Sequence, residues 1–404
     1  MTGKKDKIVK WTALAPLLLT FFSMGFADLV GIASNYAREE YLLSDSVTSL
    51  LPASLYVWFL LIAIPTGALL SHVGRRRTVV AGLVFLTLGM VPPLVADTFA
   101  ALLTSFALIG IGATVLSVGL NPLMASIVPD NRLASSLTAG QTVKALSSIC
   151  APLVASLAAS GAISLIVPGW RSVFAFCLAI AVPTTIWLAL ARIDESSSKD
   201  NISAQECGAA QKECKAGGIG ASFALMKVPA VMAAFLAVVC HVGCDVSLNM
   251  MLPRFFELRS GATLDRAALA TSLYFAARLA GSLAGIFVLR HIPIRKCLVS
   301  SLLFLTAGLA MLAFGRCGIV LCIATVLAGL GNSNICTLII SSAFLAQPAH
   351  RNEISGLTVA GLSGGAIFSM LCGLAVDHIG LTASLVPLAA ATAFILLYAA
   401  RHTR

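Results

Sequence analysis

Apolar runs of about 20 residues recur along this chain of 404 residues, and they limit the fold more than any other feature. A run of that length crosses a bilayer as an α-helix, because lipid offers no partner to an unsatisfied backbone group. The chain is therefore predicted to be an all-α, polytopic membrane protein. We expect twelve transmembrane helices, at 12–34, 47–70, 78–96, 99–126, 133–160, 171–191, 222–250, 266–289, 297–315, 318–346, 354–376 and 380–400.

The net charge of +10 reflects membrane orientation rather than a nucleic-acid partner. If both termini are cytoplasmic, most Lys and Arg residues fall in cytoplasmic segments, as the positive-inside rule requires. We therefore expect a multi-pass membrane protein with both termini in the cytoplasm, in contact with the lipid bilayer, that binds no nucleic acid. Six arginines are placed on the outer side by this topology: Arg38, Arg171, Arg254, Arg259, Arg266 and Arg316.

A polar segment at 192–218 divides the chain into two halves, 1–191 and 219–404, each with six predicted spans. Its Ser, Lys, Glu and Gly content is typical of a flexible linker, which we place in the cytoplasm. The halves repeat each other at a nearly constant offset, since Asp28 is followed 217 residues later by Asp245. Tandem six-helix halves of this kind bind a solute near the bilayer midplane, between the halves.

Four charged residues lie inside predicted spans, where an ionised side chain is costly and is usually paired or functional. Asp28 and Asp245 occupy the first span of each half, Lys144 lies on the fifth span and Arg278 on the eighth. We expect Lys144 to pair with Asp28, and Arg278 with Asp245. Two interpretations remain open: static ties between helices, or a proton-coupling site at one or both aspartates.

Side-chain amides accompany these charges at helical spacing. Gln141 lies three residues before Lys144, and Asn249 lies four residues after Asp245, so each shares a helix face with a charge. Any single amide could instead join two helices. Amides and carboxylates around one midplane site suit a hydroxyl-rich solute, and we predict as substrate contacts Gln141, Lys144, Asn249, Asn332 and Asn334.

The loop after the second span carries a recognisable signature. "GALLSHVGRRR" resembles the sequence that follows the second span of major facilitator transporters, although Ser and His replace its acidic residue and the neighbour of that residue. The resemblance implies a major facilitator fold of two pseudo-symmetric halves. It also implies a gating role for the matching residues Gly67, Gly74, Arg75 and Arg76.

Further segments are similar to the fucose–proton symporter family, which includes bacterial glucose/galactose permeases. "HVGCDVSLN" resembles "YVGAEVSIG" of the seventh span, which places Asp245 at the acidic position of that family. "ARLAG" resembles "GRFxG" and aligns Arg278 with an arginine, and "LTAGQTVKALSS" aligns Gln141 with a glutamine and Lys144 with a position where asparagine is common. Ser117 replaces a glutamate of the fucose permease.

The resemblance implies a secondary active transporter that imports a small sugar (a hexose or deoxyhexose) or a related polyol with a proton by alternating access. Coupling to Na⁺, and the choice between the two aspartates as proton carrier, remain open. No P-loop, GxSxG, HExxH or Cys/His metal motif occurs in the sequence, so we expect no enzyme activity, cofactor or metal site. Two alternatives remain, an exporter of amphipathic compounds and a transporter-derived solute sensor; we expect a monomer.

Overall fold

The computed structural model describes residues 11–128, 130–163, 167–191, 226–288, 292–346 and 351–402, so the predicted linker at 192–218 lies outside the described residues. Before this segment the elements are α1 (Trp11–Met24), η1 (Gly25–Leu29), α2 (Val30–Glu40), α3 (Asp45–Thr48), α4 (Leu50–Val73), α5 (Arg75–Gly89), α6 (Pro92–Val95), α7 (Phe99–Ile127), α8 (Asp130–Ala159) and α9 (Ser172–Leu190). After it they are α13 (Pro229–Ser260), α14 (Leu264–Ala267), α15 (Leu269–Val288), α16 (Ile294–Phe314), α17 (Gly318–Asn332), α18 (Ile335–Ala346), α19 (Arg351–Gly361), α20 (Gly364–Ile379), η4 (Leu381–Ser384) and α21 (Leu385–His402).

Twelve helical segments of the described part are long and apolar enough to cross a membrane, which confirms the predicted number. Two spans are longer than predicted. The first span continues to Glu40, and the seventh continues to Ser260, beyond the predicted end at residue 250. Arg38, Arg254 and Arg259 therefore lie on helices and not in outer loops, which corrects the predicted topology at these three residues.

These arginines fit inside helices because each guanidinium has a partner. Arg38 forms a salt bridge of 3.3 Å with Glu257, and Arg254 forms one with Asp45. Arg259 donates to the main-chain oxygen of Gly315 at 2.9 Å. A paired cation escapes much of the penalty that an isolated charge meets in a membrane.

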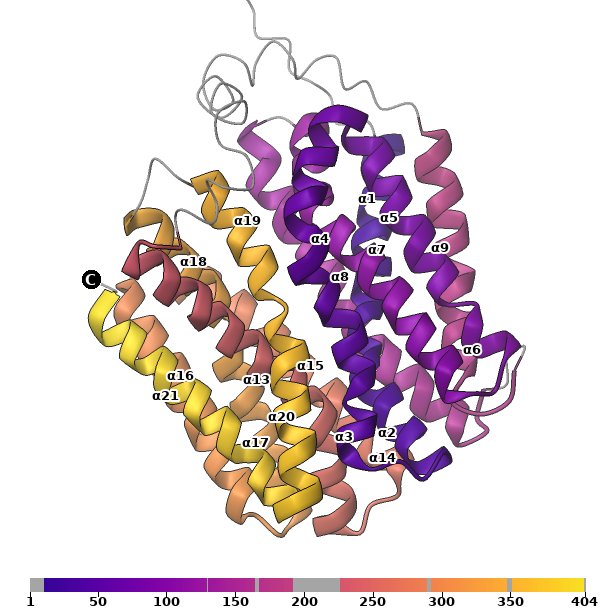
Figure 1. Ribbon diagram of the computed structural model, residues 1–404, viewed down its shortest axis with the longest axis vertical. Coiled ribbons are helices and arrows are strands. Elements are labelled where there is room, and N and C mark those ends of the chain that lie inside the picture. Colours follow the sequence, from indigo (N-terminus) through magenta and orange to yellow (C-terminus); the bar gives the residue numbers. More distant parts are fainter. Residues whose placement is uncertain are drawn as a thin grey trace, which may run out of the picture.

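The helices form two bundles that lie side by side, α1 to α9 in one and α13 to α21 in the other (Figure 1). Contacts between the bundles join α2 to α13, α3 and α4 to α20, and α8 to α15. Two glycines of α20 permit the close approach: a Cβ at Gly365 would lie 2.7 Å from the Tyr56 ring, and one at Gly373 would lie 2.6 Å from the Asp45 carbonyl oxygen. Small residues serve this purpose at membrane helix interfaces.

The first, tenth and eleventh spans are interrupted, the eleventh at Leu362 and Ser363, between α19 and α20. The 3₁₀ segment η1 separates α1 from α2, and it packs so closely on α8 that a Cβ at Gly25 would lie 2.7 Å from the Lys144 carbonyl oxygen. The tenth span breaks at Ser333 and Asn334, between α17 and α18. Discontinuous helices often form the solute and ion sites of secondary transporters.

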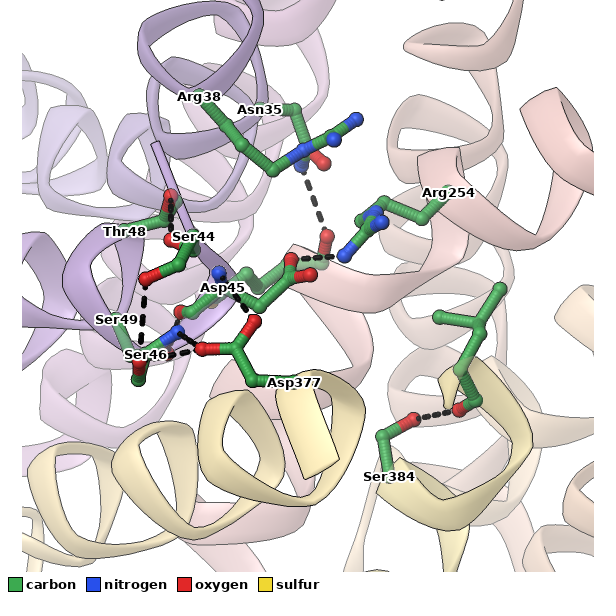
Figure 2. Close-up of polar contacts among 12 residues, drawn as sticks. Asn35, Arg38, Ser44, Asp45, Ser46, Thr48, Ser49, Arg254, Asp377 and Ser384 are labelled. Carbon is green, nitrogen blue, oxygen red and sulfur yellow. Dashed lines mark hydrogen bonds and ion pairs between the residues drawn. The ribbon is translucent and has the colours of Figure 1, made fainter. Parts of the chain in front are cut away.

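A cluster of polar residues joins the two halves at the end of the bundle that carries α3 (Figure 2). Asp45, the first residue of α3, pairs with Arg254 of α13, and both side chains are only 10% exposed. Asp377 of α20 accepts hydrogen bonds of 2.8 Å from the main-chain nitrogens of Asp45 and Ser46. The anionic Asp377 thereby satisfies free N–H groups at the start of α3. We call Asp45, Ser46, Arg254 and Asp377 the α3 latch.

A second contact repeats the geometry of the α3 latch with the halves exchanged. Tyr36 of α2 donates to Asp265 of α14 at 3.1 Å. Tyr36 and Arg254 are 218 residues apart, and Asp45 and Asp265 are 220 apart, close to the offset of the sequence repeat. In both contacts, the first span of one half therefore binds the aspartate near the start of the second span of the other half.

The Asp45–Arg254 pair is predicted to be a large single contribution to stability. Replacing Arg254 by Gln should leave Asp45 buried without its counter-charge and lower the free energy of unfolding by about 3–5 kcal/mol. The double replacement Asp45→Leu with Arg254→Met should recover most of this loss, because it leaves no uncompensated charge. Thermal unfolding of the detergent-purified protein measures both.

The matched control is Asp97→Asn, which removes another carboxylate that binds an arginine. The hydrogen bond from Arg171, followed by that from Tyr41, lowers the pKa of Asp97, yet this side chain is 68% exposed. Solvent screens such a pair, so its loss should change stability far less. Equal losses in Arg254→Gln and Asp97→Asn would contradict the stabilising role assigned to the α3 latch.

Candidate functional site

Asp245 on α13 accepts hydrogen bonds from three different side chains. Arg278 binds its Oδ2 at 2.6 Å, and Tyr274 and Asn332 donate to its Oδ1 at 2.6 and 2.9 Å. The predicted pair between Arg278 and Asp245 is therefore formed. The Arg278 side chain remains 31% exposed, whereas Tyr274 and Asn332 are fully buried. Arg278 and Asp245 present the accessible edge of this group, and Tyr274 and Asn332 support it from behind.

Asn332 was predicted to contact substrate, and the structure assigns it a supporting position instead. Its side-chain nitrogen binds both Asp245 and the Tyr274 hydroxyl, the latter at 2.7 Å, and the residue is 0% exposed. It lies at the last position of α17, where the tenth span breaks. Asn332 thus holds the Asp245 carboxylate in place from the helix break.

Asp28 lies in η1 and has a different environment. Ser148 of α8 donates to its Oδ2 at 2.5 Å, and it is the one side chain of the described part that donates to this carboxylate. No salt bridge among the described residues includes Lys144, so the predicted pair between Lys144 and Asp28 is wrong for this conformation. The close packing of η1 on α8 at Gly25 brings Ser148, one turn beyond Lys144, against the carboxylate.

The other predicted amides have separate positions. Asn249 is 4% exposed and donates from Nδ2 to the main-chain oxygen of Asp28 at 3.0 Å, which ties α13 to η1. Asn334 donates to the Gly281 carbonyl oxygen at 2.9 Å and thereby fastens the helix break to α15. Gln141 is exposed on α8, one turn before Lys144. Of these three amides, Gln141 is the one most accessible to a solute.

Charged groups from both halves converge on one region between them. Asn249, one turn beyond Asp245 on α13, binds the main-chain oxygen of Asp28, so the two aspartates lie on neighbouring elements of opposite halves. Lys144 lies one turn before Ser148, which binds the Asp28 carboxylate, and its helix α8 contacts α15, the helix of Arg278. We call the region bordered by Asp28, Lys144, Asp245 and Arg278 the central site.

Of the four predicted gating residues, Gly74 alone lies between two helices, α4 and α5. Its φ of 96° lies in the region that favours glycine, which explains the residue type at this sharp turn. Arg75 donates to the Pro122 carbonyl oxygen at 3.4 Å, and Arg76 to that of Leu188 at 3.2 Å. Both arginines therefore bind carbonyl groups toward the ends of α7 and α9 in their own half, and Gly67 lies within α4.

The sequence carried a signal for Tyr274 that the predictions did not use. The tripeptide Ser-Leu-Tyr occurs at 54–56 and again at 272–274, at the offset of the repeat. It places one tyrosine of each half beside the central site, where Tyr274 binds Asp245. The ion pair between Asp45 and Arg254 was not predicted either, because both residues lie outside the predicted spans.

Comparisons with known proteins agree with this architecture. The family described as "Major Facilitator Superfamily" matches residues 17–370. A glucose/galactose transporter of Brucella abortus biovar 1 (strain 9-941) is 23% identical over 383 residues, which cover 91% of this chain and 89% of the relative.

Two solved structures share the fold across the whole chain. A D-xylose-proton symporter has a TM-score of 0.79 at 14% identity and covers 98% of both chains. The transporter FucP in its outward conformation has a TM-score of 0.67 at 21% identity, with 97% of this chain and 98% of FucP covered. From the family match over most of its length, the chain belongs to the Major Facilitator Superfamily, and it is a membrane transporter, not an enzyme.

Proposed function

We propose that this protein imports a small sugar, or a related polyol, together with a proton by alternating access. The similarity to a glucose/galactose transporter supports a sugar as the solute, and the shared fold with a D-xylose-proton symporter is compatible with coupling to protons. The distribution of Lys and Arg supports cytoplasmic termini, and the proposal places the protein as a monomer in a bacterial inner membrane. In this orientation the α3 latch lies on the outer side.

The observation that carries the proposal is the unequal state of two repeat-related aspartates in the central site. Asp245 accepts from Arg278, Tyr274 and Asn332, and the guanidinium among these three donors favours the charged carboxylate. Asp28 accepts from Ser148 alone among the described side chains, and one oxygen remains for a proton. We therefore assign the transported proton to Asp28 and a fixed negative charge to Asp245.

Substrate hydroxyls would bind at the accessible edge of the Asp245 group. A hydroxyl both donates and accepts, so it can donate to a carboxylate and accept from a guanidinium at the same time. Arg278 and Asp245 offer this combination from one half, and Gln141 offers an accessible amide from the other. A solute held by both halves favours the conformations in which the halves approach each other.

The α3 latch fits the role of an outer gate in this cycle. Asp45 and Arg254, together with Tyr36 and Asp265, join the halves at one end of the molecule. Opening toward the outside requires both contacts to separate. Solute and proton can drive that equilibrium only by the difference between their affinities for the two conformations.

Asp28→Asn should abolish proton-driven accumulation but preserve sugar exchange. The amide imitates the protonated carboxyl, so the carrier should still reorient with solute but no longer release a proton. In proteoliposomes, counterflow of labelled glucose or galactose should remain close to wild type, and accumulation driven by a pH gradient should disappear. Asp97→Asn is the matched control and should accumulate sugar normally. Full accumulation by Asp28→Asn would exclude Asp28 as the proton carrier.

Asp245→Asn should instead abolish solute binding, because it leaves Arg278 without a counter-charge and replaces one of the two acceptor oxygens by an NH₂ donor. Tyr274→Phe removes a single donor, so we expect a smaller loss of about 1 kcal/mol, which is less than tenfold in affinity. Equilibrium binding of labelled hexose to the purified variants measures both effects. Counterflow in Asp245→Asn at the wild-type rate would show that Asp245 has no part in binding.

A further inference from the structure

Lys144 differs from three arginines that the structure places within helices near the contact between the halves. Arg278 pairs with Asp245, Arg254 with Asp45 and Arg38 with Glu257. Lys144 is half-buried in the fifth span, and no salt bridge in the described part of the chain includes it. A cation at this depth is costly unless an anion or water stabilises it.

The Lys144 side chain belongs to the central site and not to the lipid-facing surface. It lies on α8, which contacts α15, the helix of Arg278, across the interface between the halves. Four residues further along the same face of α8, Ser148 binds the Asp28 carboxylate. Two cations therefore border the central site from opposite halves, and Arg278 is 31% exposed although it is paired.

The charges of the central site leave one positive charge without a partner when the proton is bound. Asp245 and Arg278 cancel each other. The proton that the proposed function places on Asp28 neutralises that carboxylate, and the charge of Lys144 remains. A neutral sugar cannot compensate it, whereas a carboxylate on the solute can, through a charge-assisted hydrogen bond to the ammonium group.

We propose that the solute is a sugar acid, a hexuronate or an aldonate, whose carboxylate binds Lys144 while its hydroxyls bind Arg278 and Asp245. This inference rests on the proposed function, because it concerns the solute of the same central site. The carboxylate is held by one half and the hydroxyls by the other, so the charged solute bridges the halves. One sugar acid and one proton cross together without net charge.

The test compares sugar acids with neutral sugars in the full-length protein. Glucuronate, galacturonate, gluconate, glucose and galactose compete for binding and for counterflow in proteoliposomes of wild type, Lys144→Gln and Lys144→Arg. In wild type, the best sugar acid should bind at least about tenfold more tightly than the neutral hexoses. Lys144→Gln should lose about tenfold or more in the ratio of its affinity for that acid to its affinity for neutral hexose, and Lys144→Arg should retain the preference.

A membrane potential provides an independent readout. Uptake of the sugar acid driven by a pH gradient should not respond to an imposed potential, because the carboxylate and the proton cancel in charge. Uptake of a neutral hexose with a proton should accelerate when the inside is negative. Strong acceleration of sugar-acid uptake by wild type under this potential would overturn the one-to-one charge balance.

The outcomes separate this inference from the proposed function. Binding of neutral hexoses to wild type, with no competition from a large excess of any sugar acid, would overturn the sugar-acid inference and leave the proposed function intact. Binding of neither class to monodisperse wild type would overturn both. Unchanged preference in Lys144→Gln would exclude Lys144 as the recognition residue. If Lys144→Gln does not fold, the competition in wild type and Lys144→Arg still decides the solute class.

Discussion

The need to compensate every charge inside the membrane organises this transporter. Asp245 is the clearest case, because its carboxylate holds Arg278 and Tyr274 of α15 and Asn332 at the end of α17. One anion thus fixes the relative positions of three helices of the C-terminal half. Each donor also loses less by leaving water, since a charge-assisted hydrogen bond is stronger than a neutral one. These hydrogen bonds join α13, α15 and α17 on this side of the central site.

The contact between the halves follows the internal repeat but differs in chemistry. Asp45 meets Arg254 in an ion pair, and the repeat-related Asp265 meets the Tyr36 hydroxyl in a hydrogen bond that involves one charge. The ion pair loses more when the halves separate, because two buried charges must then be hydrated or left unpaired. The two repeat-related contacts therefore contribute unequally to closure. Gly365 and Gly373 of α20 permit the close approach of the halves that both contacts require.

Hydropathy and the cost of buried charge were sufficient to predict the spans and the pair between Arg278 and Asp245. The same argument failed for Lys144, because the partner of Asp28 depends on η1, a local 3₁₀ segment that no periodicity reveals. It also failed for Asp45 and Arg254, which lie beyond the predicted spans on helices that continue into the interface. Sequence patterns identify which residues need a partner. The identity of that partner depends on where helices end or break. A shift of one helical turn at such a point changes which side chain contacts the charged group.

In the proposed mechanism, the two repeat-related aspartates divide the work of coupling. Each half carries one carboxylate in its first span, but Asp245 accepts from three side chains and Asp28 from one among the described residues. The proposal gives Asp245 a fixed charge that organises the binding site. It gives Asp28 a charge that changes during the cycle, and each change would alter the electrostatic balance with Lys144 and Arg278 across the central site. Proton and solute are then linked because both act on that balance, and a ligand that shifts it equally in both conformations would transport nothing.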